Sequence, residues 1–270
     1  MPADAVFLSV FGLSCRLQLL GDAALEAKDD IERAWSRCLT SPLDAGPVPD
    51  LDIPLVIAAD AAPALAEHPG AVVASDRAEL LHALSPAVTT RALDAVAGRY
   101  YLLHACGVAL DDGGVVAFVA ASGVGKTTLA TTLSRRFGYV SDETVIVRFD
   151  GTVLAYPKPL SVLEGTDSSL KRQVSADELG LLVAPDDLHL AGVVLLDRSD
   201  DADEYPDIEE VPVLHGLAAM TEQTSYLTRM PQPLTTAVRL VEAAGGIRRV
   251  RYREAASIEP FVDVLQGAAR

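Results

Sequence analysis

The pattern of apolar and polar residues divides the chain into two parts, which meet near residue 95. The first part combines short apolar runs of strand length with stretches whose apolar residues recur at helical intervals. A loop rich in Pro, Gly and Asp occupies residues 40–50. The pattern predicts a small α+β domain over residues 1–95, with strands within 5–20 (interrupted at Phe11-Gly12), at 51–58 and at 71–75, and helices at 24–39 and from 77 towards 98.

The second part opens with a strand, a tight turn and another strand. Two apolar runs flank the polar turn DDGG at 111–114, and the second run leads directly into a helix-like stretch. There Leu129, Leu133 and Phe137 recur every four residues, and Gly138 stands where a helix C-terminal cap is expected. The pattern predicts an α/β domain over residues 96–270, with further strands at 139–149, 152–157, 188–197 and 247–254 and helices at 235–244 and 256–268.

The composition favours a globular cytoplasmic protein. Half of the 270 residues are hydrophobic and the mean hydropathy is positive, so the chain can bury a substantial core. No apolar stretch approaches the roughly 20 residues needed to cross a bilayer, and no Lys or Arg precedes the first apolar run as a secretory signal would require. The formal net charge of −16 argues against nucleic acid as the main partner, because a polyanion would be repelled.

Two further features have a structural interpretation. Cys15, Cys38 and Cys106 are an odd number of cysteines at wide spacing, which predicts buried free thiols and neither a disulfide framework nor a zinc site. The acidic segment 197–210 is interpreted as a solvated surface loop. A mobile flap that attracts a basic substrate is the functional alternative for this segment, and the sequence leaves both open.

Candidate chemistry begins at residues 120–128, AASGVGKTT. This stretch follows the pattern G-x-x-x-x-G-K-[ST], except that Ala120 stands at the first glycine. Small residues let consecutive backbone N–H groups turn towards phosphate oxygens at a helix N-terminus, while the lysine reaches the β- and γ-phosphates and the next hydroxyl ligates magnesium. We therefore predict a nucleoside triphosphate site with Mg²⁺, formed by Ala121, Ser122, Gly123, Val124, Gly125, Lys126, Thr127 and Thr128, of which Thr128 has no specific role.

Two adjacent carboxylates, Asp142 and Glu143, follow the predicted loop helix. Paired acids beside a triphosphate suit the tasks of holding magnesium and of accepting a proton from an attacking hydroxyl. A solvated turn is the structural alternative. Asp197, which ends the apolar run GVVLLD, is a second candidate for holding the metal.

These segments together resemble the HPr kinase/phosphorylase-like proteins, relatives of phosphoenolpyruvate carboxykinase in their nucleotide site. The similar segments are LHACGVAL with His104, ASGVGKTTLATTL, GYVSDE and, less specifically, YPKPLSV at 156–162. The resemblance covers about residues 101–197 and implies a P-loop kinase domain that uses ATP and Mg²⁺. It implies that Asp142 is the catalytic base, that Glu143 lies by the metal and that His104 assists the acid-base step. Without the resemblance, His104 would be interpreted as a hydrogen-bonded core residue.

Departures from the family pattern narrow the expected activity. Glu143 replaces the usual Asp, and residues 189–192, HLAG, lack the acid and the Arg of the segment that the family links to phosphate removal. The chain looks more like the stand-alone relatives found with peptide-modification genes, including kinases of lasso-peptide precursors. The resemblance thus implies a kinase that transfers the γ-phosphoryl of ATP to a hydroxyl, with Ser the first choice, of a peptide or protein such as a ribosomal-peptide precursor.

Two other functions remain open at this stage. One is a non-catalytic nucleotide-binding regulatory module, and the other is a small-molecule kinase. A GTPase is disfavoured because no NKxD-type motif is present. The acceptor, a homo-oligomeric state and the choice between ATP and GTP are not determined by the residues themselves.

Overall fold

The computed structural model describes residues 4–44, 46, 48–162 and 171–268, and the chain forms two compact units. The first unit comprises Met1–Ala95 together with Pro157–Leu179, and the second comprises Val96–Tyr156 and Gly180–Arg270. The chain is mixed α/β, with several sheets. The segment Pro157–Leu179 therefore belongs to the first unit, although the sequence pattern placed it in the second domain.

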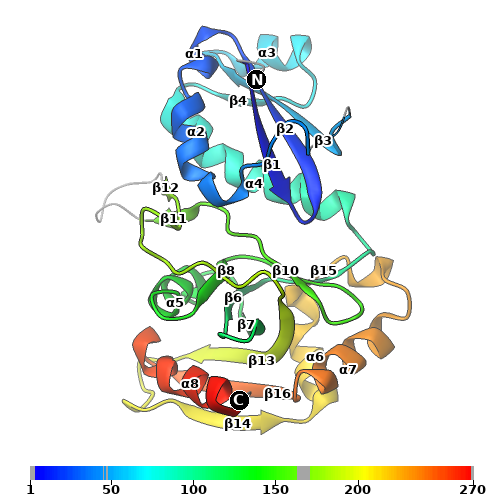
Figure 1. Cartoon of the computed structure of the whole chain (residues 1–270), viewed down its shortest axis with the longest axis vertical. Helices are drawn as coiled ribbons and strands as arrows, with labels where there is room; N and C mark the ends of the chain where they lie inside the picture. The colour runs from blue at the N-terminus through cyan, green and yellow to red at the C-terminus, as the bar shows by residue number, and fades with distance from the viewer. Residues whose placement is uncertain (1–3, 45, 47, 163–170, 269–270) are drawn as a thin grey trace. The chain divides into compact units, whose positions relative to one another are not determined.

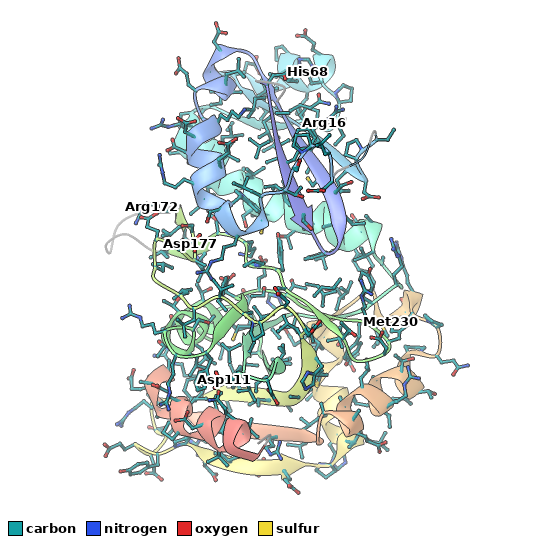
Figure 2. The ribbon with its side chains drawn as sticks, viewed as in Figure 1. Arg16, His68, Asp111, Arg172, Asp177 and Met230 are labelled. Atoms are coloured by element: carbon teal, nitrogen blue, oxygen red, sulfur yellow. The ribbon has the colours of Figure 1, made fainter. Side chains whose placement is uncertain are left out.

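The first unit is built on a four-stranded sheet of order β1-β2-β3-β4. β1 and β2 form an antiparallel hairpin, while β3 runs parallel to both β2 and β4. Phe11 and Gly12 make the hairpin turn with φ values of 57° and 74°. On the outer face the Arg16 side chain, labelled in Figure 2, forms an ion pair with Asp52 of β3. The strands are β1 (Ala5–Val10), β2 (Leu13–Leu20), β3 (Leu51–Ile57) and β4 (Val72–Ala74).

Helices complete the first unit. The single helix predicted over 24–39 is wrong, because three short helices occupy this stretch. The second of them ends at Trp35, which is almost fully buried and lies outside helical geometry at φ −96° and ψ 20°. The helices are α1 (Asp22–Leu25), α2 (Lys28–Ala34), η1 (Ser36–Cys38), α3 (Ala61–Glu67) and α4 (Arg77–Ala95).

The segment Pro157–Leu179 joins the first unit through polar contacts that its sequence does not reveal. Ser36 Oγ and Arg37 Nε donate hydrogen bonds to the carboxylate of Asp177, at 2.5 and 2.8 Å. Arg172 and Asp177 both lie on this segment (Figure 2). Within the segment β11 (Leu160–Val162) and β12 (Arg172–Val174) form an antiparallel pair.

The second unit contains a six-stranded sheet of order β14-β16-β13-β7-β6-β8. Its centre is parallel, because β13 runs parallel to both β7 and β16, whereas β14, β6 and β8 are antiparallel to their neighbours. Figure 1 shows β13 and β16 side by side below β7. The strands are β6 (Ala105–Ala109), β7 (Gly114–Val119), β8 (Gly138–Ser141), β13 (His189–Arg198), β14 (Asp207–Val211) and β16 (Ile247–Tyr252).

A second sheet of order β10-β9-β5-β15 belongs to the same unit. The single strand predicted over 139–149 is wrong, because this stretch forms β8 in one sheet and β9 in the other. The break between them, residues 142–144, carries the two candidate carboxylates. The strands are β5 (Tyr101–Leu103), β9 (Val145–Val147), β10 (Val153–Leu154) and β15 (Thr224–Ser225).

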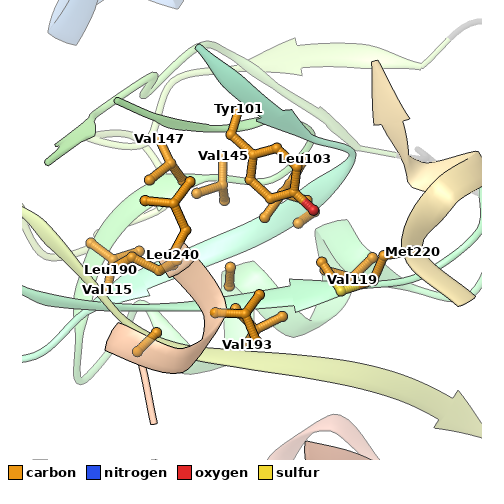
Figure 3. Packing of buried hydrophobic residues seen from close by; sticks show 14 of the residues in the cluster. Tyr101, Leu103, Val115, Val119, Val145, Val147, Leu190, Val193, Met220 and Leu240 are labelled. Carbon is orange, nitrogen blue, oxygen red and sulfur yellow. The ribbon is translucent and has the colours of Figure 1, made fainter. Parts of the chain in front are cut away.

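Helices cover both faces of the six-stranded sheet. Alternate residues of a strand point to opposite faces. Val193 therefore packs with Leu240 and Met220 from the helices on one face, together with Tyr101 and Val147 of the smaller sheet (Figure 3). On the other face, Gly192 faces Leu265 of α8. The helices are α5 (Lys126–Leu133), α6 (Val213–Met220), η2 (Thr221–Gln223), η3 (Leu227–Arg229), α7 (Pro233–Ala243), η4 (Ala255–Ile258) and α8 (Glu259–Ala268).

The interpretation of 197–210 as a loop is wrong for its last residues, which form most of β14. Glu209 and Glu210 lie opposite Arg249 and Arg248 of β16, and Glu209 forms an ion pair with Arg249 at 2.5 Å. Opposite charges on facing strands stabilise the pairing. The charges of the two strands are therefore complementary where β14 pairs with β16.

Cys15, Cys38 and Cys106 are free and buried, as predicted, and burial raises the pKa of each thiol to about 12. Among the described residues, no helix is long and apolar enough to cross a membrane.

Gly113 in the turn between β6 and β7 supplies a test of the fold. Its φ is +86°, and a Cβ atom there would lie 2.0 Å from the carbonyl oxygen of Asp187. We expect Gly113→Ala to lower the free energy of unfolding by about 2–4 kcal/mol, since both the left-handed conformation and the displaced backbone cost energy. Urea denaturation followed by circular dichroism measures the change.

Gly151→Ala is the matched control for this substitution. Gly151 has a similar φ of +94°, but nothing lies within 4 Å of its Cβ position. Its substitution should cost only about 1–2 kcal/mol, from the backbone conformation alone. Equal losses in the two variants would contradict the close approach at Gly113.

Candidate functional site

The loop between β7 and α5 has the backbone geometry of an anion cradle. Gly123 and Gly125 adopt φ values of 87° and 102°, in the left-handed region that glycine tolerates best. Gly125 is the N-cap of α5, and the first intrahelical bond runs from Leu129 N to Gly125 O. The backbone N–H groups of residues 126–128 therefore have no partner within the helix and are available to an anion.

Ala120 replaces the first glycine of the motif without strain. It lies buried at the end of β7, and it is not among the residues with positive φ. The position therefore does not need the conformational freedom of glycine, which accounts for this departure from the usual pattern.

Lys126 is the first residue of α5, and its side chain turns back over the loop. Its ammonium group donates to the carbonyl oxygens of Ala120 and Ala121, at 2.8 and 3.0 Å. Burial lowers the pKa of Lys126, an effect opposed by Cys106, Glu143 and Asp142. A buried lysine held at a loop of free N–H groups is suited to meeting a negatively charged ligand.

Asp142 lies in the break after β8, and its side chain bonds to the first turn of α5. It is buried, and its Oδ2 atom accepts a hydrogen bond from Thr127 Oγ1 at 2.9 Å. Its Oδ1 atom accepts from Tyr139 OH at 3.2 Å. Ser141 Oγ accepts from the backbone N–H groups of Glu143 and Thr144, which holds the turn that presents the carboxylate.

His104 and Glu143 lie beside this pair. The backbone N–H of His104 donates to Gln223 O at 2.7 Å, and that of Ala105 donates to Glu143 O at 3.1 Å. Burial lowers the pKa of the His104 imidazole, the Lys126 charge lowers it further, and Glu143 and Asp142 act in the opposite direction. His104 therefore belongs to the same electrostatic cluster as Lys126 and the two carboxylates.

The remaining predicted residues lie around this cluster. Ala121, Ser122 and Thr128 are exposed, and Val124 is half-buried. Asp197 is exposed near the end of β13, and Thr127 bonds to Asp142 instead. Across the described ranges, no group of three or more His, Cys, Asp or Glu side chains is arranged to hold a metal by itself.

Two residues of the site were missed from the sequence. Tyr139 supplies a hydroxyl to Asp142, and its place three residues before that carboxylate was the available signal. Arg198 has Nη1 at 3.8 Å from the position that a Cβ atom on Gly125 would occupy. Its position at the start of an acidic segment led to its interpretation as a surface residue.

The low pKa of His104 can be measured directly. Because the neutral imidazole is favoured in the folded chain, we expect its NMR titration midpoint to lie below the ordinary 6.5, and Lys126→Met to move it upwards. The neutral form stabilises the fold above pH 6.5, and this contribution is lost as the pH falls through the lowered pKa. The spectrum of His104→Gln identifies the resonance, and a wild-type midpoint at or above 6.5 would contradict the electrostatic cluster.

Comparisons with known proteins identify no family for this chain. No protein-family model matches it, and no curated protein matches it. Among solved structures, the HPr(Ser) kinase/phosphatase from Coxiella burnetii is similar over 63% of this chain and 95% of that chain, with 10% sequence identity and a TM-score of 0.29. At so low a TM-score, the likeness carries no conclusion about the fold or the function of this protein.

Proposed function

We propose that this protein is an ATP- and Mg²⁺-dependent kinase that transfers the γ-phosphoryl group to a hydroxyl of a peptide or protein. The observation that carries the proposal is the hydrogen bond from Thr127 Oγ1 to Asp142 Oδ2 at the N-terminus of α5. In phosphate-loop enzymes, a hydroxyl after the lysine and a carboxylate from another element share the metal at the nucleotide. The loop sequence and the lysine beside it support the same proposal.

In the proposed complex, the phosphates lie against the amides of the loop. Gly123 and Gly125 allow close backbone approach, and the free N–H groups at the start of α5 face the negative charge. Lys126 exchanges its bonds to the two loop carbonyls for phosphate oxygens. Charge on the transferring phosphoryl group is thereby neutralised without rearrangement of the fold.

The donor set fits magnesium, which is bound through one or two carboxylates together with substrate phosphates and water. Thr127, Asp142 and Glu143 are the residues that would hold it. When bound, the metal supplies positive charge to the β- and γ-phosphate oxygens.

Asp142 is the proposed acceptor of the hydroxyl proton. Its bonds from Thr127 and Tyr139 hold the carboxylate at the start of α5, beside the proposed phosphate site. His104 is proposed to assist the acid-base step, since its lowered pKa favours the neutral imidazole, the form that a proton acceptor requires.

The proposed acceptor is a serine-containing peptide, with a ribosomal-peptide precursor as the specific case. The net charge of −16 attracts a basic peptide and repels an acidic one. The absence of the acid and Arg from residues 189–192 supports transfer without the reverse reaction. The same proposal assigns the protein to the cytoplasm.

The test uses the full chain with Mg²⁺ and ATP, with and without peptides encoded near its gene. We expect a peptide mass increase of one phosphoryl group and ADP formation that depends on the peptide. ADP formed with a small hydroxyl compound and with no peptide would indicate a small-molecule kinase. Nucleotide binding without ADP formation under any condition would indicate a regulatory module and contradict the proposal.

A further inference from the structure

Arg198 stands beside the phosphate loop although it lies 73 residues beyond Gly125 in the chain. β13 runs parallel to β7, and Leu195 is paired with Val119, the last residue of β7. Both strands therefore end at the same edge of the sheet, and Arg198, the last residue of β13, reaches the loop there. The topology, and not the local sequence, brings this guanidinium to the site.

The guanidinium is held from one side and open on the other. Arg198 Nε donates to the backbone carbonyl of Arg253 at 3.3 Å. Its Nη1 atom is directed to the loop, 3.8 Å from the Cβ position of Gly125, the N-cap of α5. The residue is exposed, so a ligand on the loop can reach the remaining N–H groups.

The positive charges around Arg198 favour the binding of an anion. The N-terminus of a helix carries partial positive charge and disfavours cations, yet both Lys126 and Arg198 lie there. Within the part of the chain that the structure describes, no carboxylate forms an ion pair with Arg198. Asp197, its neighbour, points to the other face of the strand, as adjacent strand residues do.

We infer that Arg198 is a second phosphate-binding cation of this site. This inference rests on the proposed function, because it requires a nucleotide on the loop. The planar guanidinium can donate two parallel N–H bonds to phosphate oxygens, which a lysine ammonium cannot. Lys126 and Arg198 together match the several negative charges of a di- or triphosphate better than either cation alone.

The test measures binding of Mg·ATP, Mg·ADP, AMP and Mg·pyrophosphate to the full-length protein by calorimetry. Loss of a charged hydrogen bond to phosphate weakens binding by about 10- to 100-fold, and we expect this change in Arg198→Ala for ATP, ADP and pyrophosphate. AMP binding should change by less than about threefold, because it lacks the phosphates beyond α. Arg198→Lys should fall between the wild type and the alanine variant, because it keeps the charge and loses the paired geometry.

Arg249→Ala is the matched control, since it removes an exposed arginine whose ion pair is with Glu209 on β14. Its ligand affinities should equal those of the wild type. If wild-type protein binds ATP and Arg198→Ala binds it equally well, the inference fails while the proposed function stands. If the wild type binds no nucleotide, the proposed function is contradicted, and the inference about Arg198 fails with it. Should the alanine variant not fold, an Arg198→Lys variant with wild-type affinities for ATP and ADP overturns the paired-bond inference.

Discussion

Asp142→Asn is expected to lower the rate of phosphoryl transfer by about 10²- to 10⁴-fold, the usual contribution of a positioned acid or base. The substitution keeps the shape of a buried side chain and one of the two oxygens that accept from Thr127 and Tyr139. The other hydroxyl can turn to accept a hydrogen bond from the new amide group, so the fold should be preserved. The substitution removes the negative charge and the basic oxygen together. Nucleotide binding without Mg²⁺ should therefore change little, as judged by the melting-temperature shift with ATP alone.

Asp197→Asn is the matched control, because Asp197 is the other carboxylate that the sequence offered for the metal. It is exposed and makes no bond to Thr127, which is bonded to Asp142. Single-turnover kinetics with a peptide acceptor should give wild-type transfer for this variant. Rapid transfer by Asp142→Asn, or its loss in Asp197→Asn alone, would contradict the assignment of the active carboxylate.

Lys126→Ala is expected to weaken ATP binding by about 10- to 100-fold, because a charged hydrogen bond to phosphate is lost. The free energy of unfolding should also fall by about 1–3 kcal/mol, because the carbonyl groups of Ala120 and Ala121 lose their hydrogen-bond donor. Calorimetry measures the first effect and urea denaturation the second. Affinity for adenosine, which has no phosphate, should be unchanged.

Lys158→Ala separates the two effects of removing Lys126. Lys158 is also buried and donates to a carbonyl, that of Pro159, but it belongs to the first unit and not to the loop. This control should be destabilised while its affinity for ATP stays at the wild-type value. Unchanged ATP affinity in Lys126→Ala would contradict the phosphate loop as the binding site.

Local elements of the second unit were predictable from the chain because their causes are local. The DDGG turn between two apolar runs gives β6 and β7, and the loop glycines precede a helix as their conformations require. The candidate carboxylates 142 and 143 were placed directly after the loop helix, and the structure has Asp142 there, 15 positions after Thr127. The nucleotide, the metal and the roles of these residues remain predictions.

Other elements depend on partners that are distant in sequence. α6 has no pattern that distinguished it beforehand, and its Gly216 lies in close contact with Ile247 of β16. β14 pairs with β16, which comes much later in the chain, and the predicted strand 139–149 divides because its halves pair with β6 and β5. Pairing and burial decided these elements, because either can outweigh local propensity.

The amino-acid sequence by itself determined a mixed α/β chain, the positions of most strands and the loop with Lys126, because periodicity, turn chemistry and motif spacing are local properties. The tertiary structure alone decided that Pro157–Leu179 belongs with the first unit and that Arg198 reaches Gly125. It also selected Asp142 over Asp197 as the partner of Thr127. These outcomes depend on which strands become neighbours, and strand order is set by the packing of the whole core.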